Sequence, residues 1–236
     1  MTMIYKTQKP DLAKRTVPPS MVSSGVVIAL RPRQRLGLAR GSEQVFVVRS
    51  GMVYLEAMPQ ATSRQILDLY YPGDVIKEQS IPQIPGANLI AVQTGEVVRL
   101  NAQRLQALVE GDPDARRFLD NAMAHQYPRR LAHLAMLGAL TGEERVASLL
   151  MELALRVGEA GPDRARTFDI PLSRTEMADY LSLNADTLSR IMSKLRQTGV
   201  LGATGRGRGY APHFDALCRI TPLAETITAL HVNRPA

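Results

Sequence analysis

The side chains with the clearest capacity for molecular recognition lie together on one side of a predicted helix, residues 184–198. Apolar residues repeat there at the spacing of a helix that buries one face, while Asp186, Ser189 and Arg190 fall on the opposite side. A guanidinium matches the O6 and N7 acceptors of guanine, a carboxylate accepts from the amino group of cytosine, and a serine hydroxyl suits either role. These three residues could therefore contact the edges of base pairs in a major groove. A salt bridge between Asp186 and Arg190 is the alternative.

A second short helix precedes this one and must position it. Ser173 and Glu176 form a capping box that begins a helix ending near Leu181, and Asn184 is a suitable N-cap for the helix that follows. Ala178 is small where the first helix has to cross the second closely. Two short helices joined by so tight a turn, with an apolar stripe in the second, are typical of a helix-turn-helix.

The glycine-rich stretch after these helices, "GVLGATGRGRGYAP", predicts a β-hairpin, or wing, with two arginines near its tip. From Thr187 to Phe214 the chain holds five basic residues and no acidic one, within a net charge of +7. Cations in such positions suit the phosphates beside a groove, and a solvated basic face is the alternative explanation. The residues expected to contact phosphates are Ser173, Thr187, Lys194, Arg206 and Arg208.

Upstream of these helices the chain has the pattern of a small β-rich domain. From about Val26 to Leu100, short runs of β-forming residues meet at turns near Ser50-Gly51, Pro72-Gly73-Asp74 and Thr94-Gly95. Runs of this length and spacing indicate an antiparallel β-barrel or jelly roll.

A long helix is expected between the two domains. Asn101 opens a first helical stretch that stops at Gly111-Asp112-Pro113, and a second runs over residues 114–140. A helix of this length cannot bury a whole face within a small barrel domain, so we expect it to pair with a second copy of the chain. Pro128 should kink or interrupt it. The residues assigned to this dimer helix are Phe118, Ala122, His125, Leu131, Leu134 and Gly138.

These patterns predict an α+β protein in four parts. They are a flexible basic arm at 1–20, a β-barrel domain at 21–110, a dimerisation helix at 111–140 and a winged helix-turn-helix domain at 141–236. An apolar content of 45% with 22% charged residues is typical of a soluble globular protein. No segment has the pattern of a membrane span or signal peptide, and the single Cys218 cannot form an intramolecular disulfide. We therefore expect a cytoplasmic protein that does not engage a membrane.

In this order of parts the chain resembles the Crp/Fnr family of bacterial transcription regulators. The most specific stretch is "MADYLSLNADTLSRIMSKLRQTGVL", and "TGEERVASLLMELA" resembles the segment that follows the dimer helix in Fnr- and FixK-type members. The resemblance implies a cyclic-nucleotide-binding-like barrel and a homodimer that binds a palindromic operator in double-stranded DNA. It also implies that Ser189 and Arg190 contact bases, and that RNA polymerase is a partner.

The chain departs from the family pattern at several positions. Asp186 stands where the family usually has glutamate, so the operator is expected to differ from the usual Fnr-type sequence, and Ser182 stands where the family favours glycine. Pro85 and Gly86 occupy the positions of the arginine and hydroxyl residue that hold a cyclic phosphate in relatives. The basic arm lacks the cysteines of iron–sulfur members. We accordingly predict no bound cofactor and no response to cyclic AMP.

Three alternatives stay open at this point. A haem-sensing member of the same family could use His125 or His133 as an iron ligand. A non-specific nucleic-acid-binding module would use the basic surface without reading a sequence. A barrel enzyme is the third, but His125 is the first histidine and lies beyond the barrel, and "GRGRG" does not precede a helix start. We therefore predict that the chain is not an enzyme.

Overall fold

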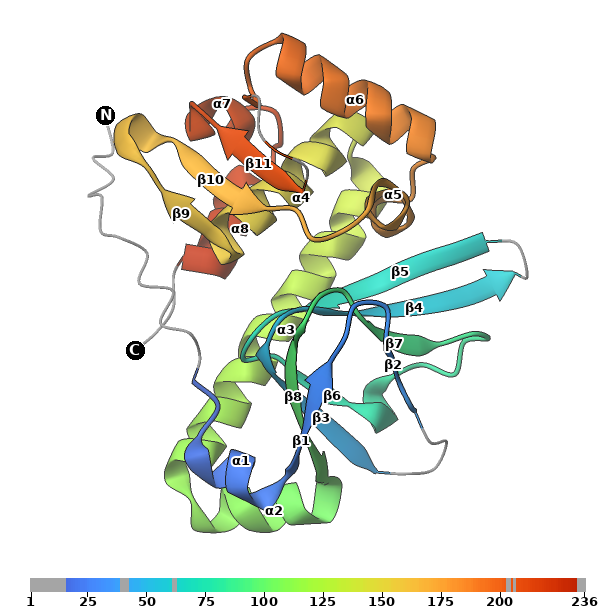
Figure 1. Ribbon diagram of the computed structural model, residues 1–236, viewed down its shortest axis with the longest axis vertical. Coiled ribbons are helices and arrows are strands. Elements are labelled where there is room, and N and C mark those ends of the chain that lie inside the picture. The colour runs from blue at the N-terminus through green and yellow to red at the C-terminus, as the bar shows by residue number, and fades with distance from the viewer. Residues whose placement is uncertain (1–15, 39–42, 61–62, 203–204, 206, 233–236) are drawn as a thin grey trace.

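The computed structural model describes residues 16–38, 43–60, 63–202, 205 and 207–232. It has an N-terminal β-sandwich and a C-terminal helical domain, and one long helix, α3, runs beside the first and leads into the second (Figure 1). Among the described residues, no helix combines the length and the apolar character needed to cross a membrane.

The β-sandwich consists of two antiparallel four-stranded sheets, in the orders β1-β8-β3-β6 and β2-β7-β4-β5. The strands are β1 (Val26–Leu30), β2 (Arg35–Leu36), β3 (Gln44–Ser50), β4 (Val53–Gln60), β5 (Ser63–Tyr70), β6 (Val75–Lys77), β7 (Asn88–Ala91) and β8 (Gly95–Asn101). Each of the three predicted turns carries the chain from one sheet to the other, and β4–β5 is a hairpin within one sheet. This arrangement is a jelly-roll sandwich and not a closed barrel.

The first sheet is covered on one face by the second sheet and on the other by helices, which explains why β3 contains a continuous run of apolar residues. Phe46 and Val48 point between the sheets, whereas Val45 and Val47 pack beneath the helices at the base of the sandwich. One of those helices, α1 (Pro19–Ser24), begins inside the predicted flexible arm, residues 1–20. Residues 1–15 lie outside the described part of the chain, but Val17 and Met21 are buried against this base.

The helices between the domains begin at the predicted caps. Asn101 accepts from the backbone N–H of Gln103 and begins α2 (Ala102–Gly111), and Asp112 caps α3 (Pro113–Ala139). The predicted interruption at Pro128 is wrong, because α3 is one continuous helix with Pro128 inside it. A proline inside a helix costs about 3 kcal/mol, and the neighbouring side chains of α3 hold this turn against the sandwich through buried hydrogen bonds.

The C-terminal domain is built around α4, whose Val146–Leu155 stretch is buried along its length except for one half-buried position. Its elements are α4 (Gly142–Arg156), β9 (Gly158–Ala160), β10 (Arg166–Asp169), α5 (Arg174–Leu181), α6 (Ala185–Gln197), β11 (Arg208–Ala211), α7 (Phe214–Cys218) and α8 (Ala224–Val232). Both predicted capping boxes are present, at Thr141 and at Ser173. β11 pairs with β10, which precedes the two short helices, and Gly202 N–H also donates to the Tyr210 carbonyl at 2.8 Å, between the two arms of the predicted hairpin.

The turn between α5 and α6 contains a backbone strain that can be measured. Ser182 has φ 51° and ψ 48°, the left-handed conformation that glycine adopts without penalty. We predict that Ser182→Gly raises the free energy of unfolding by about 1 kcal/mol in urea titrations. Ser193→Gly, at an exposed position inside α6, is the control and should lower it by about the same amount. Equal destabilisation by both variants would contradict the strain.

Candidate nucleic-acid interface

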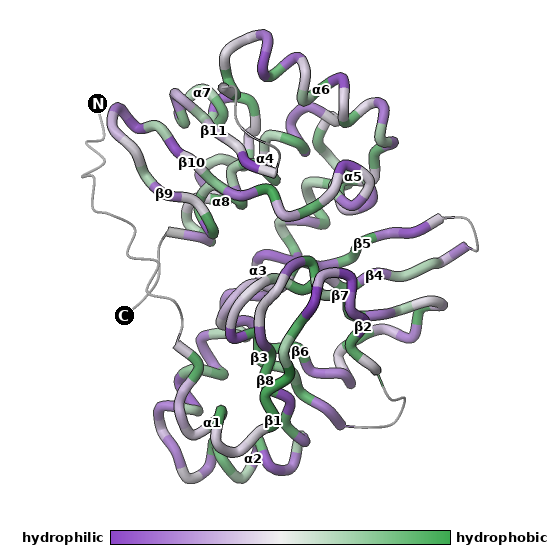
Figure 2. The backbone as a smooth tube through the Cα atoms, viewed as in Figure 1, coloured by the Kyte–Doolittle hydropathy of each residue, from purple (hydrophilic) through white to green (hydrophobic). Residues whose placement is uncertain are grey.

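The predicted base-contacting residues lie on a free surface. Asp186, Ser189 and Arg190 are exposed on α6, and Leu188, Met192 and Leu195 are buried on the opposite face. The helix forms the outer edge of its domain (Figure 1), and its hydropathy alternates along the tube in Figure 2. In the part of the chain that the structure describes, no ion pair joins Asp186 to Arg190. The three side chains are therefore available to a partner in the uncomplexed protein.

The start of α6 is fixed by its N-cap. The Asn184 side chain accepts a 2.6 Å hydrogen bond from the backbone N–H of Thr187, as the sequence predicted. Thr187 is half-buried beside this cap, and Ser173 is exposed at the equivalent point of α5, where its hydroxyl accepts from Glu176 N–H.

The predicted cationic contacts differ in how free they are. Lys194 pairs with Glu143 at 2.6 Å, and Arg208 lies 3.6 Å from Asp169. Both pairs are largely solvent-exposed, so each contributes little to stability and can exchange its partner for a phosphate. Arg206 lies outside the described residues.

One cation beside α6 was missed in the sequence. Arg174, the first residue of α5, has a buried Nη1 atom without a hydrogen-bond partner among the described residues. Burial, and then the charge of Arg196, lower the pKa of Arg174. Two guanidinium groups of like charge at this place favour an anion between or beside them. The position of Arg174 directly after the N-cap Ser173 is the feature of the sequence from which this cation could have been identified.

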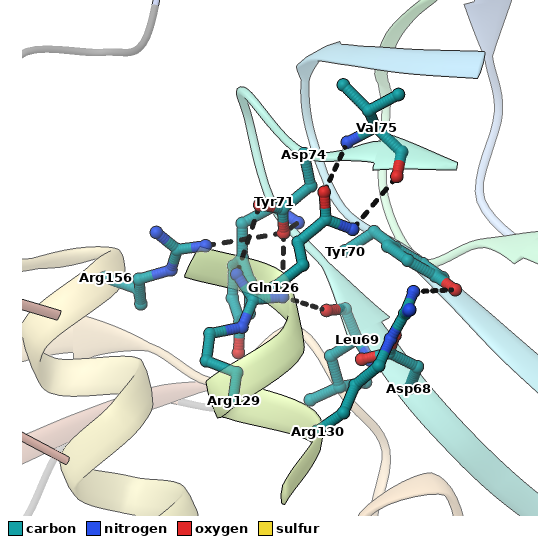
Figure 3. A network of polar contacts seen from close by, with 10 residues as sticks. All are labelled: Asp68, Leu69, Tyr70, Tyr71, Asp74, Val75, Gln126, Arg129, Arg130 and Arg156. Atoms are coloured by element: carbon teal, nitrogen blue, oxygen red, sulfur yellow. Dashed lines mark hydrogen bonds and ion pairs between the residues drawn. The ribbon is translucent and has the colours of Figure 1, made fainter. Parts of the chain in front are cut away.

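A buried ion cluster connects the recognition domain to the sandwich (Figure 3). Asp74, in the turn before β6, is completely buried and accepts from Arg129 of α3 at 2.9 Å and from Arg156 of α4 at 3.4 Å. It also accepts from the backbone N–H of Tyr71. Burial alone would raise the pKa of Asp74, but the charges of Arg129 and Arg156 outweigh it and hold the pKa below its ordinary value.

Further side chains of α3 extend this connection. The Gln126 amide accepts from the backbone N–H of Val75 at 2.9 Å and donates to its carbonyl at 3.0 Å, replacing a missing strand neighbour. Arg130 donates to Asp68 at 2.7 Å. All of these contacts come from one side of α3, so the helix cannot rotate about its axis without breaking them.

The residues predicted for the dimer helix lie on two different sides of α3. Ala122 is completely buried and Phe118 packs against the same cluster at the base of the sandwich, so both belong to the chain's own core. His125 is half-buried. The periodicity located the apolar residues of the helix but could not distinguish its two faces. Leu131 and Leu134, with Gly138, are exposed on the other side, together with Tyr127.

The comparisons with known proteins agree with this architecture. A Crp-like helix-turn-helix domain matches residues 144–220. The chain is 28% identical over 163 residues to the transcriptional activator protein Anr of Pseudomonas aeruginosa. The matched segment covers 69% of this chain and 66%, just under two thirds, of that protein. It is 29% identical over 179 residues to the nitrogen fixation regulation protein FixK of Azorhizobium caulinodans, and this match covers 76% of this chain and 72% of that protein.

Solved structures of transcription regulators are also similar to this chain. FixK2 from Bradyrhizobium japonicum has a TM-score of 0.69 at 26% identity and covers 84% of this chain and 97% of its own. A mutant of CooA from Carboxydothermus hydrogenoformans, at 16% identity, has a TM-score of 0.70 and shares the fold, covering 84% of this chain and 88% of its own. The chain is thus similar, in its helix-turn-helix domain and over most of its length, to transcription regulators of the Crp/Fnr type.

The residues present do not fit the ligands associated with this fold. Pro85 and Gly86, at the positions expected to hold a cyclic phosphate, offer neither a cation nor a hydroxyl, and the Pro85 carbonyl accepts from Met58 N–H. The ring nitrogens of His133 are buried at a cavity of about 30 Å³, which has room for water and not for a porphyrin. Burial lowers the pKa of His133 to about 4, and its ring stacks on Tyr180 at 4.1 Å.

The buried cluster generates a prediction about stability. Asp74→Asn leaves the guanidinium groups of Arg129 and Arg156 without their counter-charge, and should lower the free energy of unfolding by about 3–5 kcal/mol. The control, Glu96→Gln, breaks an exposed pair with Arg49 and should change it by less than about 1 kcal/mol. Because the folded-state pKa of Asp74 is depressed, its contribution is present above the unfolded pKa and is lost as the pH falls. Urea titrations at several pH values measure both effects, and equal losses in the two variants would contradict this assignment.

Proposed function

We propose that the chain is a sequence-specific DNA-binding transcription regulator that binds a palindromic operator as a homodimer. The observation that carries the proposal is the exposed recognition face of α6, which combines a guanidinium, a hydroxyl and a carboxylate on an ordered helix. A helix of this kind inserts its leading end into the major groove of DNA. Relatives described as transcriptional activators support this conclusion.

Within this proposal the three side chains have distinct roles. Arg190 donates in a bidentate manner to a guanine, and Ser189 contacts the neighbouring pair. Asp186 accepts from a cytosine, although its arm is one methylene shorter than the usual glutamate. Ser173, Thr187, Lys194 and Arg208 contact phosphates, which position the helix without specifying a sequence.

The dimer interface in this proposal is the exposed side of α3. Ala124, Tyr127, Leu131, Leu134 and Gly138 are exposed and separated by alternating steps of three and four residues. This is the spacing of a coiled-coil seam. Tyr127 and Leu134 expose 65% and 67% of their surface, and a second copy of α3 would bury them. Because both copies present the same residues, the interface is symmetric and matches a palindrome.

The cellular context follows from this function. A regulator of transcription works in the cytoplasm of a bacterium, where its DNA lies, and it carries out no catalysis. Relatives named as activators support RNA polymerase as a further partner.

The role of Arg190 can be tested with operator duplexes selected from a random pool. The protein should prefer its operator over random duplex by at least about a thousandfold at physiological salt. Arg190→Ala should lower operator affinity by about 1–3 kcal/mol and relax selectivity at one base pair. Arg208→Ala, the matched control, should weaken all duplexes alike and reduce the salt dependence by about one unit. If the wild-type protein binds operator and random duplex equally, the proposed function is wrong.

The dimer interface can be tested separately. Leu134→Glu places a charge in the centre of the seam and should convert the dimer to a monomer in sedimentation equilibrium, with loss of operator binding. Val27→Glu, an equally drastic change at another exposed apolar residue, should leave the dimer intact. A dimer that survives Leu134→Glu would place the interface elsewhere.

A further inference from the structure

The β4–β5 hairpin of the sandwich reaches the first helix of the recognition motif, and Figure 1 shows α5 above this hairpin. Arg64 of β5 donates through Nε to the Asp179 carboxylate of α5 at 2.7 Å, and its Nη2 lies 2.6 Å from the same oxygen. The Ser182 hydroxyl, at the end of α5, donates to the Gln65 side chain of β5 at 3.2 Å. Side chains at two successive positions of one strand therefore hold one helix of the other domain.

The pair of Arg64 and Asp179 is partly shielded from solvent, because the two side chains expose only 32% and 19% of their surface. Burial alone would lower the pKa of Arg64, but the hydrogen bond and the charge of Asp179 outweigh it and raise the pKa. Glu56 lies 3.6 Å from the same guanidinium, and the Tyr54 hydroxyl donates to Glu176 of α5 at 3.3 Å. Hydrogen bonds between charged groups are the strongest of these contacts and have a defined geometry.

Apolar packing at this junction does not define the position of α5 in the same way. Ile66 of β5 belongs to the same buried cluster as Met177 and Leu181 of α5. Burial of apolar surface is favourable but non-directional, so it permits α5 to tilt on the hairpin. A cleft of about 380 Å³ also opens beside these contacts. The directional bonds of Arg64 are therefore what specifies where α5 lies on the sandwich.

The recognition domain is thus attached to the sandwich at two separate places. The first is the buried ion cluster, which holds Arg156 at the end of α4. The second is the pair of Arg64 and Asp179. Since α6 forms the outer edge of its domain (Figure 1), a small rotation about the end of α4 displaces α6. The second attachment opposes that rotation, because α5 packs directly on α6.

We propose that Arg64 is a positioning residue for operator recognition. Acting through Asp179, it sets the orientation of α6 in each subunit before DNA is bound, and so determines which distance between half-sites the dimer accepts. This inference rests on the proposed function. One base pair inserted between the half-sites moves one of them by about 3.4 Å and rotates it by about 34°. A domain attached at two places resists such a change, whereas a domain attached at one place can follow it.

The experiment measures binding of the full-length protein to the selected operator and to the same half-sites moved apart by one base pair. The wild-type protein should bind the selected spacing at least about tenfold more tightly. Arg64→Ala should reduce this preference to about threefold or less, and should keep the preference for the half-site sequence over a scrambled one. A variant that only loses stability weakens binding to both duplexes by the same factor, so the ratio of the two affinities reports the orientation of α6.

A second variant tests whether Arg64 acts through its partner. Asp179→Ala should reduce the spacing preference as much as Arg64→Ala does, and the double variant should be no worse than either single variant, because residues that act as one pair are not additive. Arg49→Ala, which breaks an exposed ion pair with Glu96 inside the sandwich, is the matched control and should keep the wild-type preference.

Three results would overturn the inference. They are a wild-type protein that binds both spacings equally, an Arg64→Ala variant that keeps the spacing preference, and effects of the two single variants that add in the double variant. Each of these leaves the preference for operator over random duplex intact. Only the absence of that preference in the wild-type protein would reject the proposed function.

Discussion

The carboxylate of Asp74 lies where the β-sandwich, α3 and α4 meet, fully buried between the guanidinium groups of Arg129 and Arg156. Ions in such a place are stable only when their partners are complete, because removing one leaves an uncompensated charge in the interior. The three segments that supply this cluster come from three different parts of the chain. Their relative orientation is therefore fixed by one set of charges, and the rest of the structure depends on it.

Two consequences of that constraint reach the proposed DNA-binding surface. With Gln126, Arg129 and Arg130 all bound to the sandwich, α3 has one possible rotation, which buries Ala122 and turns Leu131 outward. The same cluster holds α4, and α4 is the core on which α5 and α6 pack. A symmetric pair of α3 helices would then place both copies of α6 in a fixed relation to one another, as the reading of a palindrome requires.

The features that the sequence predicted most accurately are those that depend on local chemistry. The caps at Asn101, Thr141, Ser173 and Asn184 lie where hydroxyl and amide side chains can satisfy the first backbone donors of a helix, and each was found at its predicted position. The exposed face of α6 followed from its apolar periodicity in the same way. These signals need only residues a few positions apart.

The errors concern contacts between distant residues. Nothing local reveals that β11 pairs with β10, or that the turn at Gly73 crosses between two sheets. Pro128 is tolerated because of side chains that bind the sandwich, and Ala122 is buried by residues far away in sequence. The sequence indicated only a turn at Asp74, since its two arginine partners are more than fifty residues away.

Selecting duplexes from a random pool with the purified protein tests most directly whether two copies of α6 read DNA together. The account predicts enrichment of an inverted repeat whose half-site centres lie about one helical turn, roughly 34 Å, apart. Enrichment of a single unrepeated site, or of no sequence at all, would contradict it.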